Sequence, residues 1–282
     1  MEKTKVSVQG VPETMLQTLY ARASESQKPN HHIYDEKAIK VVSRMDYDFT
    51  KASNDNMMRL GVIARTIVLD QLVEDYLQHH PQTLVINIAC GMDTRCYRVK
   101  ASYSRWYNVD LPETMQIRQT FFKEEGPIYQ IAKSATDASF LDEVEYNGEP
   151  VLIIIEGLTM YLSEQDVKTM FSILDRKFSN ARILVETMSP FFVKTVKEKS
   201  IEGSQAQFTW GIKNGAQLHT LLPNFHNVKD VSLVEGMKVL MPIYHILGIF
   251  PFVRNISNKI LVMQKETLSS AYSENPSIKN SK

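Results

Sequence analysis

The spacing of hydrophobic positions changes near Pro81 and divides the chain into two parts. Before this proline, residues 13–23 and 60–78 carry apolar side chains at helical spacing, with charged residues between them. After it, short apolar runs alternate with longer polar stretches. We therefore expect residues 1–80 to form a helical N-terminal cap and residues 81–265 to form an α/β core.

Seven apolar runs after Pro81 predict the strands of one sheet: residues 83–89, 105–110, 128–133, 151–156, 181–187, 228–234 and 259–265. The runs TLVINIA and VLIIIE are continuous rather than alternating, which is typical of strands covered by helices on both faces. Helix-like stretches separate most runs, and residues 163–178 begin with Ser163 as a suitable N-cap. This order predicts a doubly wound, mostly parallel seven-stranded α/β sheet.

Two insertions, at about residues 189–223 and 236–258, interrupt this alternation. Both are rich in aromatic and methionine side chains, which together form an adaptable apolar wall. We expect them to form a lid over a ligand site, with Trp210 and Phe252 contacting the ligand. Packing of these side chains into a local core beneath a long loop is the alternative. The tail of residues 266–282 is rich in Ser, Asn and Lys and is expected to be disordered.

The second insertion contains the most apolar segment of the chain, residues 237–253. Lys238, His245 and two prolines interrupt it, so it is too short and too broken to span a bilayer. A buried or pocket-lining segment is the favoured interpretation. A contact with one leaflet of a membrane, or with a protein partner, is the other.

The amino-acid composition argues against nucleic-acid binding, a disulfide scaffold and a zinc site. Thirty-two basic residues balance thirty-two acidic ones, so no broad positive field favours nucleic acid. The two cysteines, Cys90 and Cys96, are too few for a disulfide scaffold or a zinc site and are expected to be buried thiols. The first ten residues contain no apolar leader, which favours a cytoplasmic location. No transmembrane segment or metal site is expected, and nothing in the chain fixes an oligomeric state.

Acidic residues follow four predicted strands in succession. In a sheet of this kind, ligands bind beyond the carboxyl ends of the strands, where the strand order reverses. The first run ends at Gly91-Met92-Asp93, and the next three lead to Asp110, Asp137 and Glu156. One acidic residue at a strand end is more often a helix cap or a solvated turn, but four in a row indicate a ligand site.

The turn after the first strand favours a particular kind of nucleotide. A dinucleotide site needs the pattern G-x-G-x-x-G, whereas this turn has only Gly91, and Asp93 would repel a pyrophosphate. Asp110 stands 19 positions after Gly91, about the spacing at which an acidic residue reaches ribose hydroxyls. A ribose without a pyrophosphate indicates S-adenosylmethionine and argues against a nicotinamide dehydrogenase.

Several blocks of the sequence resemble one known family: INIACGMDTRCYRV, NVDLPETMQIRQ, SATDAS, IIIEGLTMYLSEQDV and ARTIVLDQLV, with a looser likeness in HHIYDEKA and FTWGI. They resemble the motifs of the leucine carboxyl methyltransferase superfamily, particularly its bacterial, tetracenomycin-type branch of polyketide-synthesis O-methyltransferases. The likeness covers roughly residues 60–186. Ala89 departs from the pattern, since a glycine commonly stands at this position.

The resemblance implies a class I S-adenosylmethionine-dependent methyltransferase fold, which is Rossmann-like, and assigns roles to matching residues. Gly91 would let the backbone pass close to the cofactor. Asp110 would hold the ribose, Asp137 would face the adenine amine, and Glu156 would lie near the methionyl portion. Tyr161 would either close the substrate pocket or simply pack.

Arginines near this site have two possible roles. Arg65 would bind the methionyl carboxylate through a bidentate guanidinium, or would instead pair on the helix surface with Asp70 or Glu74. For Arg95 and Arg98, structural pairing is favoured over a cofactor contact.

The chemistry of methyl transfer leaves the catalytic residue open. A carboxylate acceptor is already ionised at neutral pH, whereas a hydroxyl acceptor would need a nearby base. His219, His226 and His245 show no spacing typical of a catalytic pair. We therefore expect methylation of a carboxylate or acidic hydroxyl on a small hydrophobic molecule. Methylation of a protein C-terminus, and a non-catalytic protein that binds S-adenosylmethionine, are the alternatives.

Overall fold

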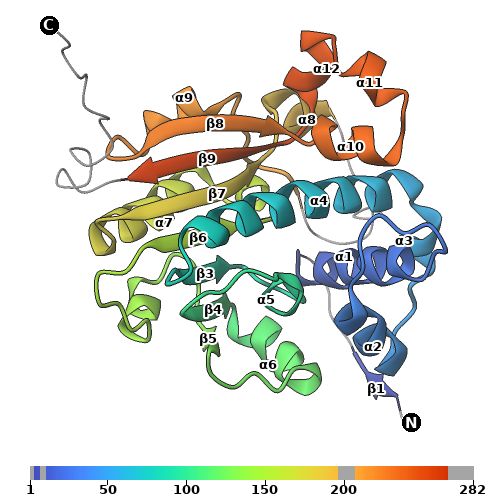
Figure 1. The fold of residues 1–282 in the computed structure, drawn as a ribbon, viewed down its shortest axis with the longest axis horizontal. Coiled ribbons are helices and arrows are strands. Elements are labelled where there is room, and N and C mark those ends of the chain that lie inside the picture. The colour runs from blue at the N-terminus through green and yellow to red at the C-terminus, as the bar shows by residue number, and fades with distance from the viewer. Residues whose placement is uncertain (1–2, 7–10, 196–206, 266–282) are drawn as a thin grey trace, which may run out of the picture.

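The computed structural model describes residues 3–6, 11–195 and 207–265, and Figure 1 shows their arrangement. Its centre is a seven-stranded sheet with the order β5-β4-β3-β6-β7-β9-β8. The strands are β3 (Leu84–Ile88), β4 (Arg105–Asp110), β5 (Ile128–Ala132), β6 (Val151–Ile155), β7 (Ala181–Thr187), β8 (His226–Ser232) and β9 (Lys259–Lys265). Each predicted apolar run is a strand, although the sixth starts and ends two residues earlier than expected.

The direction of the strands confirms a mostly parallel sheet. The first five strands pair in parallel, whereas β9 is antiparallel to both of its neighbours, β7 and β8. The strand order reverses at β3, which lies between β4 and β6. The carboxyl ends of β3, β4, β6 and β7 therefore share one edge of the sheet, which we call the carboxyl edge.

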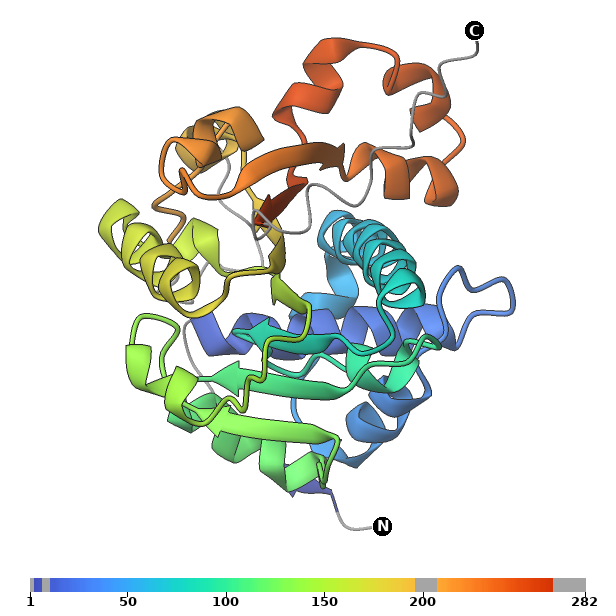
Figure 2. The ribbon, with the colours of Figure 1, turned by 60° about the vertical axis from the view of Figure 1, so that its left-hand side comes forward.

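Helices cover both faces of the sheet, and Figure 2 shows α4 and α7 on opposite sides. On one face α4 (Asn56–His79) packs Leu69 and Val73 against Val85 and Leu152. On the other face α7 (Glu164–Lys177) packs Phe171 and Leu174 in the cluster that contains Ile153 and Ile183. Every residue of β3 and β6 is consequently buried, which explains why these two runs are apolar without alternation.

The cap of α7 follows the sequence prediction. The hydroxyl of Ser163 accepts a hydrogen bond from the N–H of Asp166 at 3.1 Å, and Glu164 and Asp166 place negative charge in the first turn. Both features stabilise a helix N-terminus, so this helix begins where its sequence predicts.

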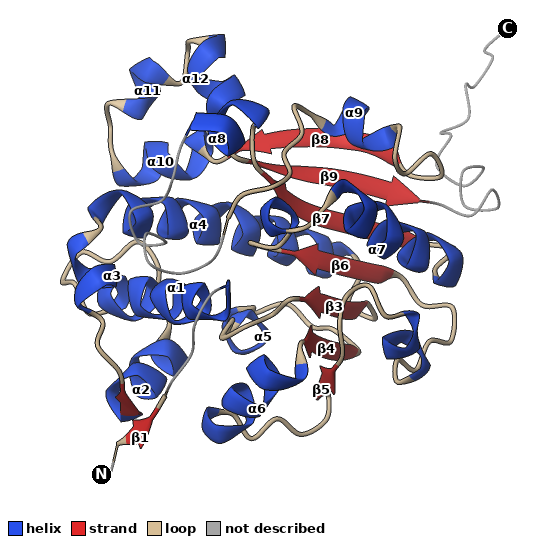
Figure 3. Ribbon diagram, turned by 180° about the vertical axis from the view of Figure 1, so that it is seen from behind, coloured by secondary structure: helices blue, strands red, loops and turns tan. Residues whose placement is uncertain are grey.

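Three helices that precede β3 in sequence lie at the carboxyl edge. They are α1 (Val11–Ser26), α2 (Glu36–Arg44) and α3 (Thr50–Asn54), with the short parallel pair β1 (Thr4–Lys5) and β2 (Met45–Asp46). Leu16 and Leu19 of α1 pack with Met92, which belongs to the turn after β3. The long helix α4 differs from these three because it lies along the sheet (Figure 3).

Shorter helices complete the core and the insertions. They are α5 (Arg95–Arg98), α6 (Pro112–Phe121), the 3₁₀ turns η1 (Ala138–Asp142) and η2 (Thr159–Tyr161), α8 (Pro190–Thr195), α9 (Gly215–His219), α10 (Val234–Leu240), α11 (Tyr244–Leu247) and α12 (Pro251–Ile256). Among the described residues, no helix combines the length and the apolar character needed to cross a membrane. The tail that was expected to be disordered lies outside the described residues.

The second insertion docks onto the N-terminal half of α4. An added Cβ on Gly236 would lie 2.1 Å from the carbonyl oxygen of Ala64, so only a glycine lets α10 approach α4 this closely. Leu240 joins the small cluster of Val62 and Ile63. Beyond α10, the helices α11 and α12 have no buried residues.

Candidate functional site: the carboxyl edge

The turn after β3 has an unusual backbone that explains its glycine. Gly91 adopts φ +47°, and a Cβ at this position would lie 2.9 Å from the Cβ of Met15 in α1. Ala89 adopts φ +53° and is the only non-glycine residue with positive φ in the described part of the chain. Left-handed backbone strains an L-residue, and such strain is concentrated at functional sites. The glycine that commonly stands at position 89 in the resembling family would remove this strain.

Asp110 braces the turn from the neighbouring strand. Its carboxylate accepts one bond from the N–H of Gly91 and one from the N–H of Leu111, both at 2.7 Å. Burial raises the pKa of Asp110, while the two backbone bonds act in the opposite direction. The Thr114 side chain also donates to this carboxylate, whose four lone pairs leave one site for a further bond, such as one from a ribose hydroxyl.

The bond from the N–H of Gly91 to Asp110 helps to distinguish a dinucleotide site from a site for S-adenosylmethionine. A pyrophosphate site offers backbone N–H groups to the phosphate oxygens, but here the N–H of Gly91 already donates to a carboxylate. A carboxylate at that place would repel a phosphate and attract hydroxyl or ammonium groups. The turn therefore fits the ribose of S-adenosylmethionine and does not fit a dinucleotide.

Arg95 lies at the centre of a buried ion-pair network, with 1% of its side chain exposed. Its guanidinium contacts Asp70 at 2.7 Å, Asp93 at 2.7 Å and Glu156 at 2.8 Å. Burial alone would raise the pKa of Asp93, but the guanidinium groups of Arg95 and Arg98 hold it well below its usual range. Arg95 thus has the structural role that was favoured for it.

A second part of the network connects the N-terminal helices to the turn. Asp35, which is fully buried, accepts bonds from Arg22 and Arg98 at 3.0 Å each. Arg22 also donates to the carbonyl oxygen of Met92 at 2.8 Å. Both guanidinium groups therefore link α1 and α2 to the turn that carries Gly91. The sequence analysis missed Asp35, although the likeness in HHIYDEKA contains it.

Arg65 and Glu156, both predicted to bind the cofactor, lie together. Their side chains form an ion pair with 2.7 Å between Nε and Oε1, and each is 13% exposed. Arg65 also contacts Glu186 at 2.9 Å, and that carboxylate accepts a bond from the N–H of Gly157. Asp70, the partner considered from the sequence, pairs with Arg95 and Arg98. The pair of Arg65 and Glu156 presents a cation and an anion, which match the carboxylate and ammonium groups of a methionyl moiety.

Asp137 lies farther along the carboxyl edge, in the exposed loop after β5. It caps η1 by accepting a bond from the N–H of Ser139 at 2.9 Å. This bond lowers the pKa of Asp137, so its carboxylate is ionised. A contact with an adenine amine is compatible with these bonds and stays a prediction.

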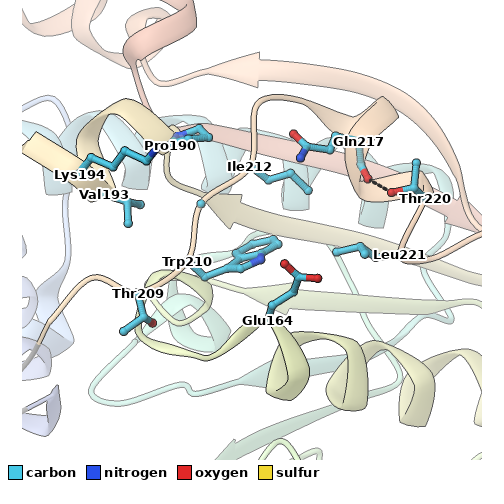
Figure 4. A pocket seen from close by; sticks show the side chains of 11 residues that line it. Glu164, Pro190, Val193, Lys194, Thr209, Trp210, Ile212, Gln217, Thr220 and Leu221 are labelled. Atoms are coloured by element: carbon cyan, nitrogen blue, oxygen red, sulfur yellow. Dashed lines mark hydrogen bonds between the residues drawn. The ribbon is translucent and has the colours of Figure 1, made fainter.

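Trp210 lines a cavity of about 450 Å³ next to the ends of β6 and β7, shown in Figure 4. The segment that carries it is fixed at two points. The N–H of Thr209 donates to the carbonyl of Met160 at 2.7 Å, and the N–H of Ile212 donates to the carbonyl of Met188 at 2.9 Å. The cavity is lined by Glu164, Pro190, Val193, Lys194, Thr209, Trp210, Gly211, Ile212, Gln217, Thr220 and Leu221. We call this cavity the Trp210 pocket.

The other two predicted substrate residues are placed differently. Tyr161 contacts Phe208, with 5.5 Å between ring centroids, and so packs against the segment that leads to Trp210. Phe252 lies on α12 with 67% of its side chain exposed, and it does not line the Trp210 pocket. The structure therefore does not bring Trp210 and Phe252 into one pocket, because α10 holds the second insertion against α4.

The three histidines of the C-terminal half and the two cysteines form no pair with one another among the described residues. His219 bonds the carbonyl of Phe225, and His226 and His245 lie on separate elements. Cys90 and Cys96 are buried free thiols, as predicted, and burial raises the pKa of Cys96 to about 12. Across the ranges 3–6, 11–195 and 207–265, no group of His, Cys, Asp and Glu is arranged to hold a metal ion.

Comparison with known proteins agrees with this geometry. The profile of the leucine carboxyl methyltransferase family matches residues 15–175, which include most of α1, Arg65, the Gly91 turn and Glu156. The chain is 29% identical to the tetracenomycin polyketide synthesis O-methyltransferase TcmP of Streptomyces glaucescens, over 82% of this chain and 86% of that protein. It is also 29% identical to the S-adenosyl-L-methionine-dependent methyltransferase dpfgK of Gibberella zeae, over 79% of this chain and 82% of the relative.

A solved structure supports the fold independently of sequence. The crystal structure of a candidate methyltransferase from Thermobifida fusca superposes with a TM-score of 0.56, over 88% of this chain and 94% of the other, at 11% identity. The profile match spans more than half of the chain and contains the ends of β3, β4 and β6, with Gly91, Asp110 and Glu156. The protein therefore belongs to the leucine carboxyl methyltransferase family and is an S-adenosylmethionine-dependent methyltransferase.

Proposed function

We propose that this protein transfers the methyl group of S-adenosylmethionine to a carboxylate or acidic hydroxyl of a small hydrophobic molecule. The observation that carries this proposal is the position of the Trp210 pocket at the ends of β6 and β7. These strands follow β3 and β4 along the same carboxyl edge. A cofactor at the ends of β3 and β4 would therefore have the acceptor beside it.

The cofactor would be held by two contacting pairs, Gly91 with Asp110 and Arg65 with Glu156, and by the separate Asp137. Asp110 would accept bonds from the ribose, and Gly91 would allow the backbone to approach. Arg65 and Glu156 would bind the carboxylate and the ammonium group of the methionyl portion, and Asp137 would bind the adenine amine. When bound, the cofactor supplies an electrophilic methyl group on a sulfonium.

The acceptor class is inferred from the lining of the Trp210 pocket. Trp210, Ile212 and Leu221 provide an apolar wall, which suits a flat hydrophobic molecule. Lys194 also lines the pocket, and no carboxylate of the described residues lies within 4.0 Å of it. Glu164, by contrast, already pairs with Lys168. A cation with no carboxylate partner among the described residues favours a negatively charged acceptor.

Such an acceptor would react without a dedicated base. An ionised carboxylate is already a nucleophile at neutral pH, so the protein needs to orient it in line with the S–CH₃ bond and exclude water. The Trp210 pocket would provide the orientation, and Lys194 would steer the charged end. A hydroxyl acceptor would in addition need a base within hydrogen-bond reach.

Methyl transfer to a panel of aromatic carboxylic acids and phenols tests the proposal. We expect S-adenosylhomocysteine to form with a hydrophobic acid or acidic phenol, and mass spectrometry to detect the methylated product. Mild alkali will hydrolyse a methyl ester but not a methyl ether, so the same assay identifies the methylated group. Transfer only to peptides that end in a free carboxylate would instead support methylation of a protein C-terminus. Tight cofactor binding without any turnover would support the non-catalytic alternative.

A further inference from the structure

The segment formed by residues 239–256, which we call the apolar arm, exposes an unusual amount of hydrophobic surface. Half of the large hydrophobic side chains that are exposed in the described residues lie between Val239 and Phe252. The most exposed are Ile249 at 74%, Phe252 at 67% and Ile246 at 60%. Contiguous exposed apolar surface usually marks an interaction site.

The arm has no core of its own to explain this surface. Its two helices, α11 and α12, contain four and six residues and no buried side chain. Figures 1 and 2 show both helices standing out from the body of the molecule beyond α10. The arm is anchored through α10, where Gly236 and Leu240 meet α4. Its projecting side chains are therefore available to an external surface.

The charges around the arm identify the kind of surface. Residues 236–265 contain no Asp or Glu, whereas the arm carries His245 and Arg254 and follows directly on Lys238. The nearest carboxylate, Glu235, contacts Lys238 at 2.9 Å and Arg254 at 2.6 Å. One carboxylate thus faces two cations, so these three side chains carry a net charge of +1 in a protein whose net charge is zero.

This charge pattern disfavours a symmetric contact with a second copy of the chain. In a two-fold contact the same patch meets itself, so Lys238 and Arg254 of one copy would face those of the other, and Glu235 already pairs with both cations within its own copy. An anionic lipid surface satisfies both features, because headgroup phosphates attract the cations while the acyl boundary accepts Ile and Phe side chains.

We propose that the apolar arm inserts into the surface of an anionic lipid bilayer. The arm follows β8, which runs parallel to β7 because both are antiparallel to β9. It therefore leaves the sheet at the carboxyl edge, and docking through it would bring this edge toward the lipid. This inference does not depend on the identity of the methyl acceptor.

Vesicle flotation of the full-length protein tests the inference. We expect the protein to float with vesicles of equal parts phosphatidylcholine and phosphatidylglycerol, and to bind pure phosphatidylcholine several-fold more weakly. The double variant Ile246→Ser/Ile249→Ser should reduce binding to the mixed vesicles about tenfold or more, because both side chains are lost from the inserted surface. Both are exposed, so circular dichroism and cofactor affinity should match the parent protein.

The control variant Met57→Ser removes a side chain of similar exposure, 66%, from the start of α4 and outside the arm. It should leave vesicle binding unchanged. Failure of the parent protein to float with either vesicle type would overturn the proposal, as would equal binding by the double variant. A parent dimer in sedimentation velocity that the double variant dissociates would also overturn it, because a second copy would then cover the arm.

Discussion

The two ends of the carboxyl edge differ in how far their polar groups are already satisfied. Around the Gly91 turn, four arginines and five carboxylates are joined by ion pairs of 2.7 to 3.6 Å. In the Trp210 pocket, Lys194 has no partner among the described carboxylates, and the walls are largely side chains from short helices and loops. The first region is held rigid by its own ion pairs, whereas the second leaves a cation and an apolar wall open to a ligand.

The largest effect should come from breaking the network at its centre. Arg95→Leu would leave Asp70, Asp93 and Glu156 around an apolar side chain, and removal of one partner from a buried pair costs about 3–5 kcal/mol. Urea unfolding followed by circular dichroism should detect this loss. Lys40→Leu is the control, since Lys40 and its partner Glu36 are both mostly exposed and such pairs contribute about 1 kcal/mol or less. Equal losses in the two variants would contradict a central role for Arg95.

Gly91→Ala should have the next largest effect. The left-handed backbone costs an alanine about 1–2 kcal/mol, and the contact with Met15 adds an overpacking cost of about 1–3 kcal/mol. The free energy of unfolding should fall accordingly. Gly61→Ala is a matched control in α4, where an added Cβ meets nothing within 4 Å, and it should stabilise the helix by about 0.5–1 kcal/mol. A stable Gly91→Ala protein would mean that α1 does not press on the turn as described.

Asp110→Ala should weaken binding of S-adenosylmethionine by about 1–3 kcal/mol, because the ribose hydroxyls would lose their acceptor. Calorimetry measures the change directly. Asp137→Ala should weaken binding less, since Asp137 is exposed and water can replace its bonds. If Asp110→Ala binds the cofactor like the parent protein, the ribose assignment is wrong.

Lys194→Gln addresses the other end of the edge. For an acceptor that carries a carboxylate, KM should rise about fivefold, which corresponds to the roughly 1 kcal/mol of one partly exposed ion pair. Cofactor affinity should be unchanged, because Lys194 does not line the Gly91 turn. An unchanged KM together with a lower cofactor affinity would contradict the proposal that Lys194 contacts the acceptor and not the cofactor.

Ala89→Gly should have the smallest effect. Removing the left-handed strain contributes about 1–2 kcal/mol, but the more flexible unfolded chain offsets about 0.5–1 kcal/mol of it. A net gain of up to about 1 kcal/mol is expected from thermal unfolding. Ala23→Gly in α1 should instead destabilise by about 1 kcal/mol. Destabilisation by Ala89→Gly would show that the Ala89 methyl group has a packing role.

The sequence contained enough information to predict the sheet and the acidic ends of its strands. Continuous apolar runs predict buried parallel strands, and Asp110 follows from its spacing to Gly91. Ion pairs between residues that are distant in sequence could not be predicted in the same way. Asp35 and Glu186 are far from Arg98 and Arg65 in sequence, and only the packing of α2 and β7 brings them close. The separation of Trp210 from Phe252 depends on the docking of α10, which one glycine makes possible.

The position of the last strand has a consequence for how the chain is synthesised. β9 lies between β7 and β8, although it follows both in sequence. Until it leaves the ribosome, β7 has an open edge and β8 has no partner in the sheet. At about 5–20 residues per second, these edges stay unpaired for the seconds needed to translate the preceding helices. Unpaired edges invite aggregation, so the nascent chain should depend on chaperones most strongly just before β9 emerges.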